Sequence, residues 1–109
     1  MSTEINANVI KRNGVEVIFD KAKIINAVQK ANEEVPKLHQ LSQYQITALA
    51  DMIATRALES SHAVNVEDIQ DMVETGIMEM RGYEVAQKYV LYRFKIELTR
   101  KYNTKDDNI

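Results

Sequence analysis

Cysteine and tryptophan are absent from this sequence of 109 residues, proline occurs once and glycine three times. Without cysteine the chain cannot form a disulfide, a thiolate zinc site or an iron–sulfur centre, and it offers no cysteine nucleophile or thiyl radical. Aromatic residues make up only 6%, so aliphatic side chains and five methionines must do most of the packing. The length suffices for one compact domain with a core, but not for two.

Long apolar runs are missing as well. No stretch approaches the ~20 residues that a membrane-spanning helix needs, and the N-terminal MSTEINANV has neither the basic nor the apolar segment of a signal peptide. We therefore expect a cytoplasmic protein with no membrane partner. Apolar residues at 45% and charged residues at 28% are typical of a globular chain. The formal net charge of −2 does not favour nucleic acid as a partner.

The first regular element is predicted to be a β-hairpin. Two β-prone runs, Val9–Arg12 and Val15–Phe19, flank the pair Asn13-Gly14. Both residues of that pair tolerate positive φ, which indicates a tight turn between the strands. The segment Ser61–Val64 is too short to be an independent element but could add a third, brief strand.

Four helices are predicted to follow, at about residues 21–34, 43–60, 66–80 and 83–102, because apolar residues recur there with helical spacing. The last helix carries apolar residues around much of its circumference, so we expect it to be the most buried. Gly82 suits the end of the third helix. The predicted fold is mainly α (α+β): a four-helix domain over residues 1–102, capped by a hairpin or small three-stranded sheet. The expected N-terminal caps are Asp20, Ser42 with Gln45, and Asn65.

No enzyme motif is recognisable. The chain has no nucleophile elbow, no HExxH and no Gly-rich loop of the Walker or dinucleotide type. We expect His39 and His62 to be solvated or hydrogen-bonded locally, since a metal site needs partners that the sequence does not offer. Acidic residues in the first turns of the third helix complement its dipole; they are Glu67, Asp68, Asp71 and Glu74. We therefore expect neither catalytic residues nor side-chain metal ligands.

Three basic residues are more informative. Lys11 and Arg12 immediately precede the predicted turn, and Lys23 lies in the first turn of the first helix, where backbone N–H groups favour an anion. Adjacent strand residues point to opposite faces, so Lys11 and Arg12 can serve one site only if the strand end twists or bulges. Either residue could then approach Lys23 around a polyphosphate. The alternative, that all three are solubilising surface charges, stays open on this evidence.

Several segments of the sequence resemble a known protein family. The segment Val9-Ile10-Lys11-Arg12-Asn13-Gly14, followed by Phe19-Asp20 and Lys23-Ile24, resembles the opening motif of ATP-cone domains. The resemblance continues through Val66-Glu67-Asp68-Ile69 and through Ala86-Gln87-Lys88-Tyr89-Val90-Leu91-Tyr92-Arg93, and spans about residues 8 to 102. ATP-cones regulate ribonucleotide reductases and also occur in a bacterial repressor of reductase genes. The short hairpin and the tail Asn103-Thr104-Lys105-Asp106-Asp107 look most like the start of an anaerobic (glycyl-radical) reductase.

The resemblance implies a nucleotide, ATP or dATP with Mg²⁺, bound between a small sheet and four helices. By the same resemblance Lys11, Arg12 and Lys23 contact the triphosphate. Val9 would contact the adenine, and Asn26 lies one helical turn after Lys23. Tyr92 is expected either to stack or hydrogen-bond with the nucleotide or to pack in the core. The remaining candidate residues that the resemblance implies are Gln70 and Lys95.

One position departs from the family pattern. Several relatives carry a glutamate on the second strand that helps to read the base, and the matching position here is Val17. Glu16 is one residue away, so we expect it to point to the other face of the strand. Backbone groups would then have to replace that carboxylate.

The resemblance implies an allosteric module rather than an enzyme. ATP would support and dATP would suppress a parent reductase, whose catalytic domain is the expected partner. Residues 103–109 would be a flexible linker toward that domain, and nucleotide-dependent self-association is a further expectation. Two alternatives stay open: the nucleotide-sensing part of a transcriptional repressor, disfavoured because the chain lacks the cysteines of a zinc ribbon, and a helical interaction domain with no ligand.

Overall fold

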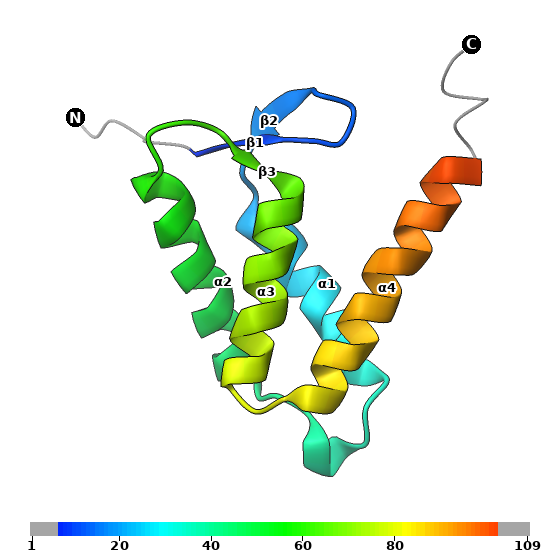
Figure 1. Ribbon diagram of the computed structural model, residues 1–109. Coiled ribbons are helices and arrows are strands. Elements are labelled where there is room, and N and C mark those ends of the chain that lie inside the picture. The colour runs from blue at the N-terminus through cyan, green and yellow to red at the C-terminus, as the bar shows by residue number, and fades with distance from the viewer. Residues whose placement is uncertain (1–6, 103–109) are drawn as a thin grey trace.

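The computed structural model describes residues 7–102, with the side chains of residues 7–99. The predicted linker, 103–109, lies outside the described residues. Three short strands and four α-helices form a mainly α fold, as predicted, with the sheet across one end of the helices (Figure 1). None of the helices in this described part is long and apolar enough to cross a membrane. The elements are β1 (Asn8–Ile10), β2 (Glu16–Ile18), α1 (Lys21–Glu33), a 3-10 turn (Lys37–His39), α2 (Gln43–Glu59), β3 (Val64–Asn65), α3 (Val66–Glu79) and α4 (Tyr83–Tyr102).

The sheet has the strand order β2-β1-β3. β1 pairs antiparallel with β2, where Val9 lies opposite Val17, and parallel with β3, where Val9 lies opposite Val64. The third strand is thus present, but it begins at Val64, the last residue of the segment predicted for it. The sheet order therefore places β1, the strand with the basic residues at its end, in the centre.

The hairpin turn is longer than the predicted two-residue turn. The N–H of Lys11 donates to the carbonyl of Val15 at 2.8 Å, and the N–H of Gly14 donates to the carbonyl of Lys11 at 2.9 Å. These bonds enclose a three-residue loop, Arg12 to Gly14, in which Gly14 alone has a positive φ, of 85°. That combination is a turn followed by a glycine bulge. Arg12 is therefore a turn residue, and the alternation of strand side chains no longer separates it from Lys11.

Two of the predicted helix caps are confirmed. The side chain of Asp20 accepts a hydrogen bond from the N–H of Ala22 at the start of α1. Ser42 and Gln45 form a reciprocal capping box at the start of α2. Both caps depend on residues within three positions of each other, which explains why the sequence predicts them well.

The ends of α3 differ from the prediction. Asn65 occupies the N-cap position and pairs in β3, but its side chain makes no capping hydrogen bond. At the other end the left-handed position is taken by Arg81, with φ of 64°, and not by Gly82. Gly82 is needed for space instead, since a Cβ atom there would lie 3.0 Å from Leu41 and 3.2 Å from Ile77.

The prediction that the last helix is the most buried is wrong. Among the described side chains α4 buries Val85, Ala86 and Tyr89, whereas Leu91 is 60% exposed and Phe94 57%. Figure 1 shows the reason: α4 diverges from α1 and α3 toward its C-terminal end. The helix with the most buried residues is α2, which contributes Ile46, Leu49, Ala50, Ile53 and Ala57 to the core.

Candidate functional site

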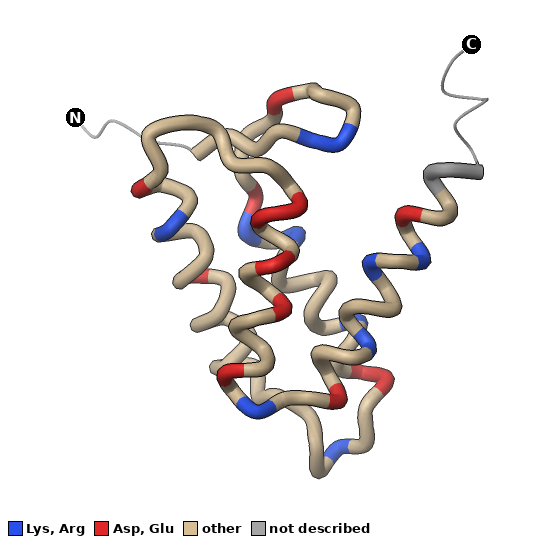
Figure 2. Tube along the Cα trace, in the orientation of Figure 1, with Lys and Arg blue, Asp and Glu red and all other residues tan. Residues whose placement is uncertain are grey.

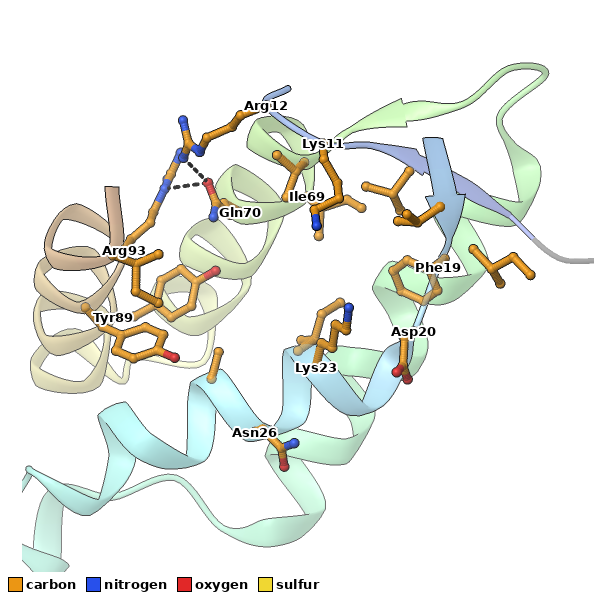
Figure 3. Close-up of a pocket in the computed structure, with 18 residues that line it drawn as sticks. Lys11, Arg12, Phe19, Asp20, Lys23, Asn26, Ile69, Gln70, Tyr89 and Arg93 are labelled. Atoms are coloured by element: carbon orange, nitrogen blue, oxygen red, sulfur yellow. Dashed lines mark hydrogen bonds between the residues drawn. The ribbon is translucent and has the colours of Figure 1, made fainter. Parts of the chain in front are cut away.

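A pocket of about 410 Å³ opens between the sheet, α1, α3 and α4 (Figure 3). Its volume lies within the range of roughly 300–1,000 Å³ that small-molecule sites span. The pocket exists because α4 diverges while the hairpin covers the end of the helices. Every element that frames it therefore contributes side chains, although these are far apart in the sequence.

Seven of the eight predicted binding residues line this pocket. The exception is Lys95, which is exposed on α4. The pocket side of α4 is formed by residues that share one face through their spacing of three and four, namely Tyr89, Tyr92, Arg93 and Ile96. Lys95 falls outside that stripe. The residues that the structure brings together are Val9, Lys11, Arg12, Lys23, Asn26, Gln70 and Tyr92.

Lys11 and Lys23 enter the pocket from different elements. Lys11 extends from the end of β1 and Lys23 from the first turn of α1, and Figure 3 shows both side chains directed into the space between them. Within residues 7–99 neither lysine has an ion-pair partner, whereas the neighbouring Lys21 pairs with Asp51 on α2 at 2.6 Å. Two positive charges that enter one pocket without an ion-pair partner in this part of the chain attract an anion.

Arg12 reaches across the rim of the pocket to α3 and α4. Its Nη1 donates to carboxylate oxygens of Glu67 and Glu97, each at 2.9 Å, and its Nη2 donates to Oε1 of Gln70 at 3.1 Å. Gln70 also accepts a hydrogen bond of 3.0 Å from Nε of Arg93. One amide oxygen thus joins arginines from the hairpin and from α4, as the dashed lines in Figure 3 show.

Arg93 is a pocket residue that the prediction did not single out, although it stands at the end of the motif that ends Tyr92-Arg93. Its Nη1 donates to Asp71 at 3.1 Å and to Glu74 at 2.7 Å. Burial works against the charged form, but the hydrogen bonds to these two carboxylates outweigh it, so the pKa of Arg93 rises above its ordinary value. Arg93 therefore stays charged beside the pocket.

The acidic residues of α3 have a role beyond the helix dipole. Figure 2 shows acidic positions following one another along α3, below the basic residues of the hairpin. Glu67 pairs with Arg12, while Asp71 and Glu74 pair with Arg93. The sequence suggests only the dipole as a reason for this acidic run. The arginines that pair with it come from distant parts of the chain, so their contacts are not visible in the sequence.

The second strand turns an apolar side chain, and not a carboxylate, toward the pocket. Val17 lines the pocket at the centre of β2. Glu16 is exposed and does not line the pocket; it accepts a hydrogen bond of 2.7 Å from Asn8. It therefore points to the other face of the strand, as expected. Together with Val9 and Ile69, Val17 makes this wall of the pocket apolar.

Two tyrosines form the wall on α4. Tyr92 is half-buried and lines the pocket, and its ring also meets the ammonium of Lys30 at 5.7 Å. Packing and pocket lining are therefore compatible for this residue. Tyr89 is 5% exposed, and burial raises its pKa to about 12, although the charge of Arg93 acts in the opposite direction. Tyr89 is thus a neutral residue at ordinary pH.

The histidines make local or surface contacts. His39 pairs with Glu84 at the opposite end of the helices from the sheet, and His62 hydrogen-bonds with Ser60 and Ser61. Over the part of the chain that the structure describes, no group of three or more His, Cys, Asp or Glu residues is placed to hold a metal ion.

Comparison with known proteins agrees with this architecture. The model of the ATP cone domain family matches residues 7–97. An anaerobic ribonucleoside-triphosphate reductase of Haemophilus influenzae is 34% identical over 96 residues, which cover 87% of this chain and 13% of the relative. A vitamin B12-dependent ribonucleoside-diphosphate reductase of Thermoplasma acidophilum is 37% identical over 92 residues, 80% of this chain and 12% of the relative. The α subunit of a ribonucleoside-diphosphate reductase of Chlamydia pneumoniae is 32% identical over 94 residues, 78% of this chain and 9% of the relative.

The chain thus spans about a tenth of the length of these curated relatives. The family match, by contrast, covers most of the chain: the hairpin, the first three helices, α4 as far as residue 97, and every residue that lines the pocket. The predicted order of hairpin and helices agrees with it. The chain belongs to the ATP-cone family.

Proposed function

We propose that this chain is a regulatory domain that binds ATP or dATP in the pocket between the sheet, α1, α3 and α4. The observation that carries the proposal is the convergence of Lys11 and Lys23, from two different elements, on a pocket with apolar and aromatic walls. A triphosphate needs concentrated positive charge, whereas an adenine ring needs flat apolar surface. This pocket offers both.

The proposed contacts follow from where each side chain lies. Lys11, Lys23 and Arg12 bind the triphosphate, and Asn26 lies at the rim one turn after Lys23. Val9 and Val17 form the apolar wall for the base, with Tyr92 and Gln70 on the opposite helices. Magnesium would be coordinated by phosphate oxygens of the nucleotide and by several water molecules, as is usual for this ion. Lys95 would contribute only if the phosphates extended beyond the pocket.

We propose that the domain is part of a ribonucleotide reductase, in keeping with the reductases that this chain resembles, and that this reductase is an anaerobic one. In this proposal ATP supports and dATP suppresses the reductase. The two nucleotides must then differ in their affinity for two conformations, because equal binding shifts no equilibrium. The chain supplies the effector site, residues 103–109 lead to the catalytic domain, and the exposed apolar side chains of α4 support nucleotide-dependent self-association.

Calorimetry on the isolated chain tests the proposal. We expect saturable binding of ATP and of dATP, with a rise in melting temperature, and weaker binding of GTP and inorganic tripolyphosphate, which carry the charge without the adenine. Absence of both heat and thermal shift at millimolar ATP would contradict the proposal. That outcome would favour the alternative of a helical interaction domain with no ligand.

A further inference from the structure

One side chain, Arg12, holds the tip of the hairpin to α3 and to α4 at the same time. Its partners are Glu67 and Gln70 on α3 and Glu97 on α4, and we call these contacts the Arg12 bridge. The side chain of Arg12 is 25% exposed, so the bridge lies at the rim of the pocket, partly shielded from water. Arg12 also lines the pocket itself.

The bridge matters because α4 has few other polar attachments after its first turns. Beyond Tyr89, the described side chains of α4 that hydrogen-bond to another element are those of Arg93 and Glu97. Phe94 is 57% exposed, so apolar packing on this half of the helix is incomplete. Glu97 is therefore the polar contact that ties the diverging end of α4 to the hairpin.

A phosphate at the two pocket lysines would compete for the same guanidinium. Both hydrogens of Nη1 of Arg12 are already committed, one to Glu67 and one to Glu97. A phosphate is as strong an acceptor for arginine as a carboxylate, and a triphosphate carries more charge. Around the bridge, two arginines face four carboxylates, those of Glu67, Asp71, Glu74 and Glu97. Drawing Arg12 toward a phosphate would leave Glu67 and Glu97 without this cation and beside additional negative charge.

We infer that Arg12 is shared between two anions, the triphosphate of a bound nucleotide and the Glu67–Glu97 pair. Binding of the nucleotide then breaks the Arg12 bridge and loosens the second half of α4 from the hairpin. The inference rests on the proposed function, because the nucleotide is the competing anion. It links occupancy of the pocket to the position of the last described helix.

An affinity measurement tests the competition. Glu97→Ala removes one competing carboxylate, so we expect it to tighten ATP binding by about two- to fivefold, the range set by a partly exposed ion pair. Glu79→Ala is the matched control, because it removes one negative charge from an exposed position on α3 that lies outside the bridge and the pocket. If Glu97→Ala binds ATP no more tightly than Glu79→Ala, the inference is wrong.

A distance measurement tests the movement. Because the chain lacks cysteine, spin labels can be attached at Val15→Cys on the hairpin and Thr99→Cys on α4 without removing any other thiol. We expect ATP to lengthen and broaden the distance distribution between the labels, and Glu97→Ala to broaden it without nucleotide. If calorimetry detects ATP binding and the distances do not change, the inference fails and the proposed function stands. If ATP does not bind at all, both fail.

Discussion

The side-chain oxygen of Gln70 accepts a hydrogen bond of 3.0 Å from Nε of Arg93. A second bond of 3.1 Å reaches the same oxygen from Arg12. Arginine side chains only donate, so the amide must turn its oxygen toward them. Its Nε2 group takes no part in these two bonds, and Gln70 lines the pocket. α3 therefore places a neutral amide between two cationic neighbours at the pocket. We expect its Nε2 group to donate to a bound nucleotide.

The orientation of Gln70 can be tested with Gln70→Glu. A carboxylate keeps both bonds to the arginines, but it replaces the donor by an acceptor and adds a negative charge to the pocket. We expect the affinity for ATP to fall by about tenfold, the value of one lost hydrogen bond to a charged group, while the melting temperature is retained. Gln70→Ala should lower the affinity less. Equal ATP affinity of Gln70→Glu and the unsubstituted chain would show that this side chain does not face the nucleotide.

The phosphate end of the pocket is tested by the double variant Lys11→Ala/Lys23→Ala. Each lysine should supply one charge-assisted contact, so we expect ATP to bind more weakly by an order of magnitude or more. Lys37→Ala serves as the control, since Lys37 lies in the 3-10 turn, outside the pocket. An unchanged affinity of the double variant, measured by calorimetry, would place the site elsewhere.

The side chain at position 17 is expected to affect the selectivity of the pocket for adenine over guanine. With an apolar side chain at this position, we expect the unsubstituted chain to prefer ATP over GTP only modestly, by about tenfold or less, because backbone groups must read the base. Val17→Glu places a carboxylate at the same wall and should increase the ATP-to-GTP affinity ratio. The two affinities are compared by competition calorimetry. A ratio that falls in Val17→Glu would mean that the base lies away from β2.

The close contact of α3 with α2 predicts a cost for Gly76→Ala. A Cβ atom at position 76 would lie 2.2 Å from Cδ1 of Leu49, whose side chain is 1% exposed. Because the Leu49 side chain is enclosed in the core and has little room to move away, we expect a loss of about 1–3 kcal/mol in the free energy of unfolding. Thr75→Ala, on the exposed side of the same helix, should change it by no more than about 0.5 kcal/mol. Urea denaturation of both variants measures these changes. Equal denaturation midpoints of Gly76→Ala and Thr75→Ala would contradict the close contact.

The buried Tyr89 is expected to lower the stability of the fold at alkaline pH. The pKa of this residue is raised to about 12 from an ordinary 10.0, chiefly by burial. Between these values an unfolded tyrosine loses its proton while the folded one keeps it, so the unfolded state gains as the pH rises. We expect about 3 kcal/mol of stability to be lost over this interval through this residue, and Tyr89→Phe to remove that part of the slope. An identical slope in Tyr89→Phe and in the unsubstituted chain would contradict the assignment.

The sequence predicted best what depends on neighbouring residues. The cap at Asp20 and the capping box of Ser42 and Gln45 join residues two or three positions apart, and both are present. The hairpin was placed correctly, but its turn is one residue longer, because Gly14 alone takes the left-handed conformation. That single residue moves Arg12 off the strand and allows it to share a pocket with Lys11.

The sequence by itself determined the four helices, the hairpin and the motifs of the family, because periodicity, caps and turn residues act over a few positions. The tertiary structure alone decided which side of each helix meets another. It exposed Phe94 where the apolar pattern predicted burial, brought Arg93 to the pocket and left Lys95 outside it. The divergence of α4 from α1 and α3 leaves Phe94 exposed and opens the pocket that Arg93 lines, whereas Lys95 lies on another side of the same helix. Such an arrangement depends on contacts between residues distant in the chain, of which the pair Arg12 and Glu97 is one.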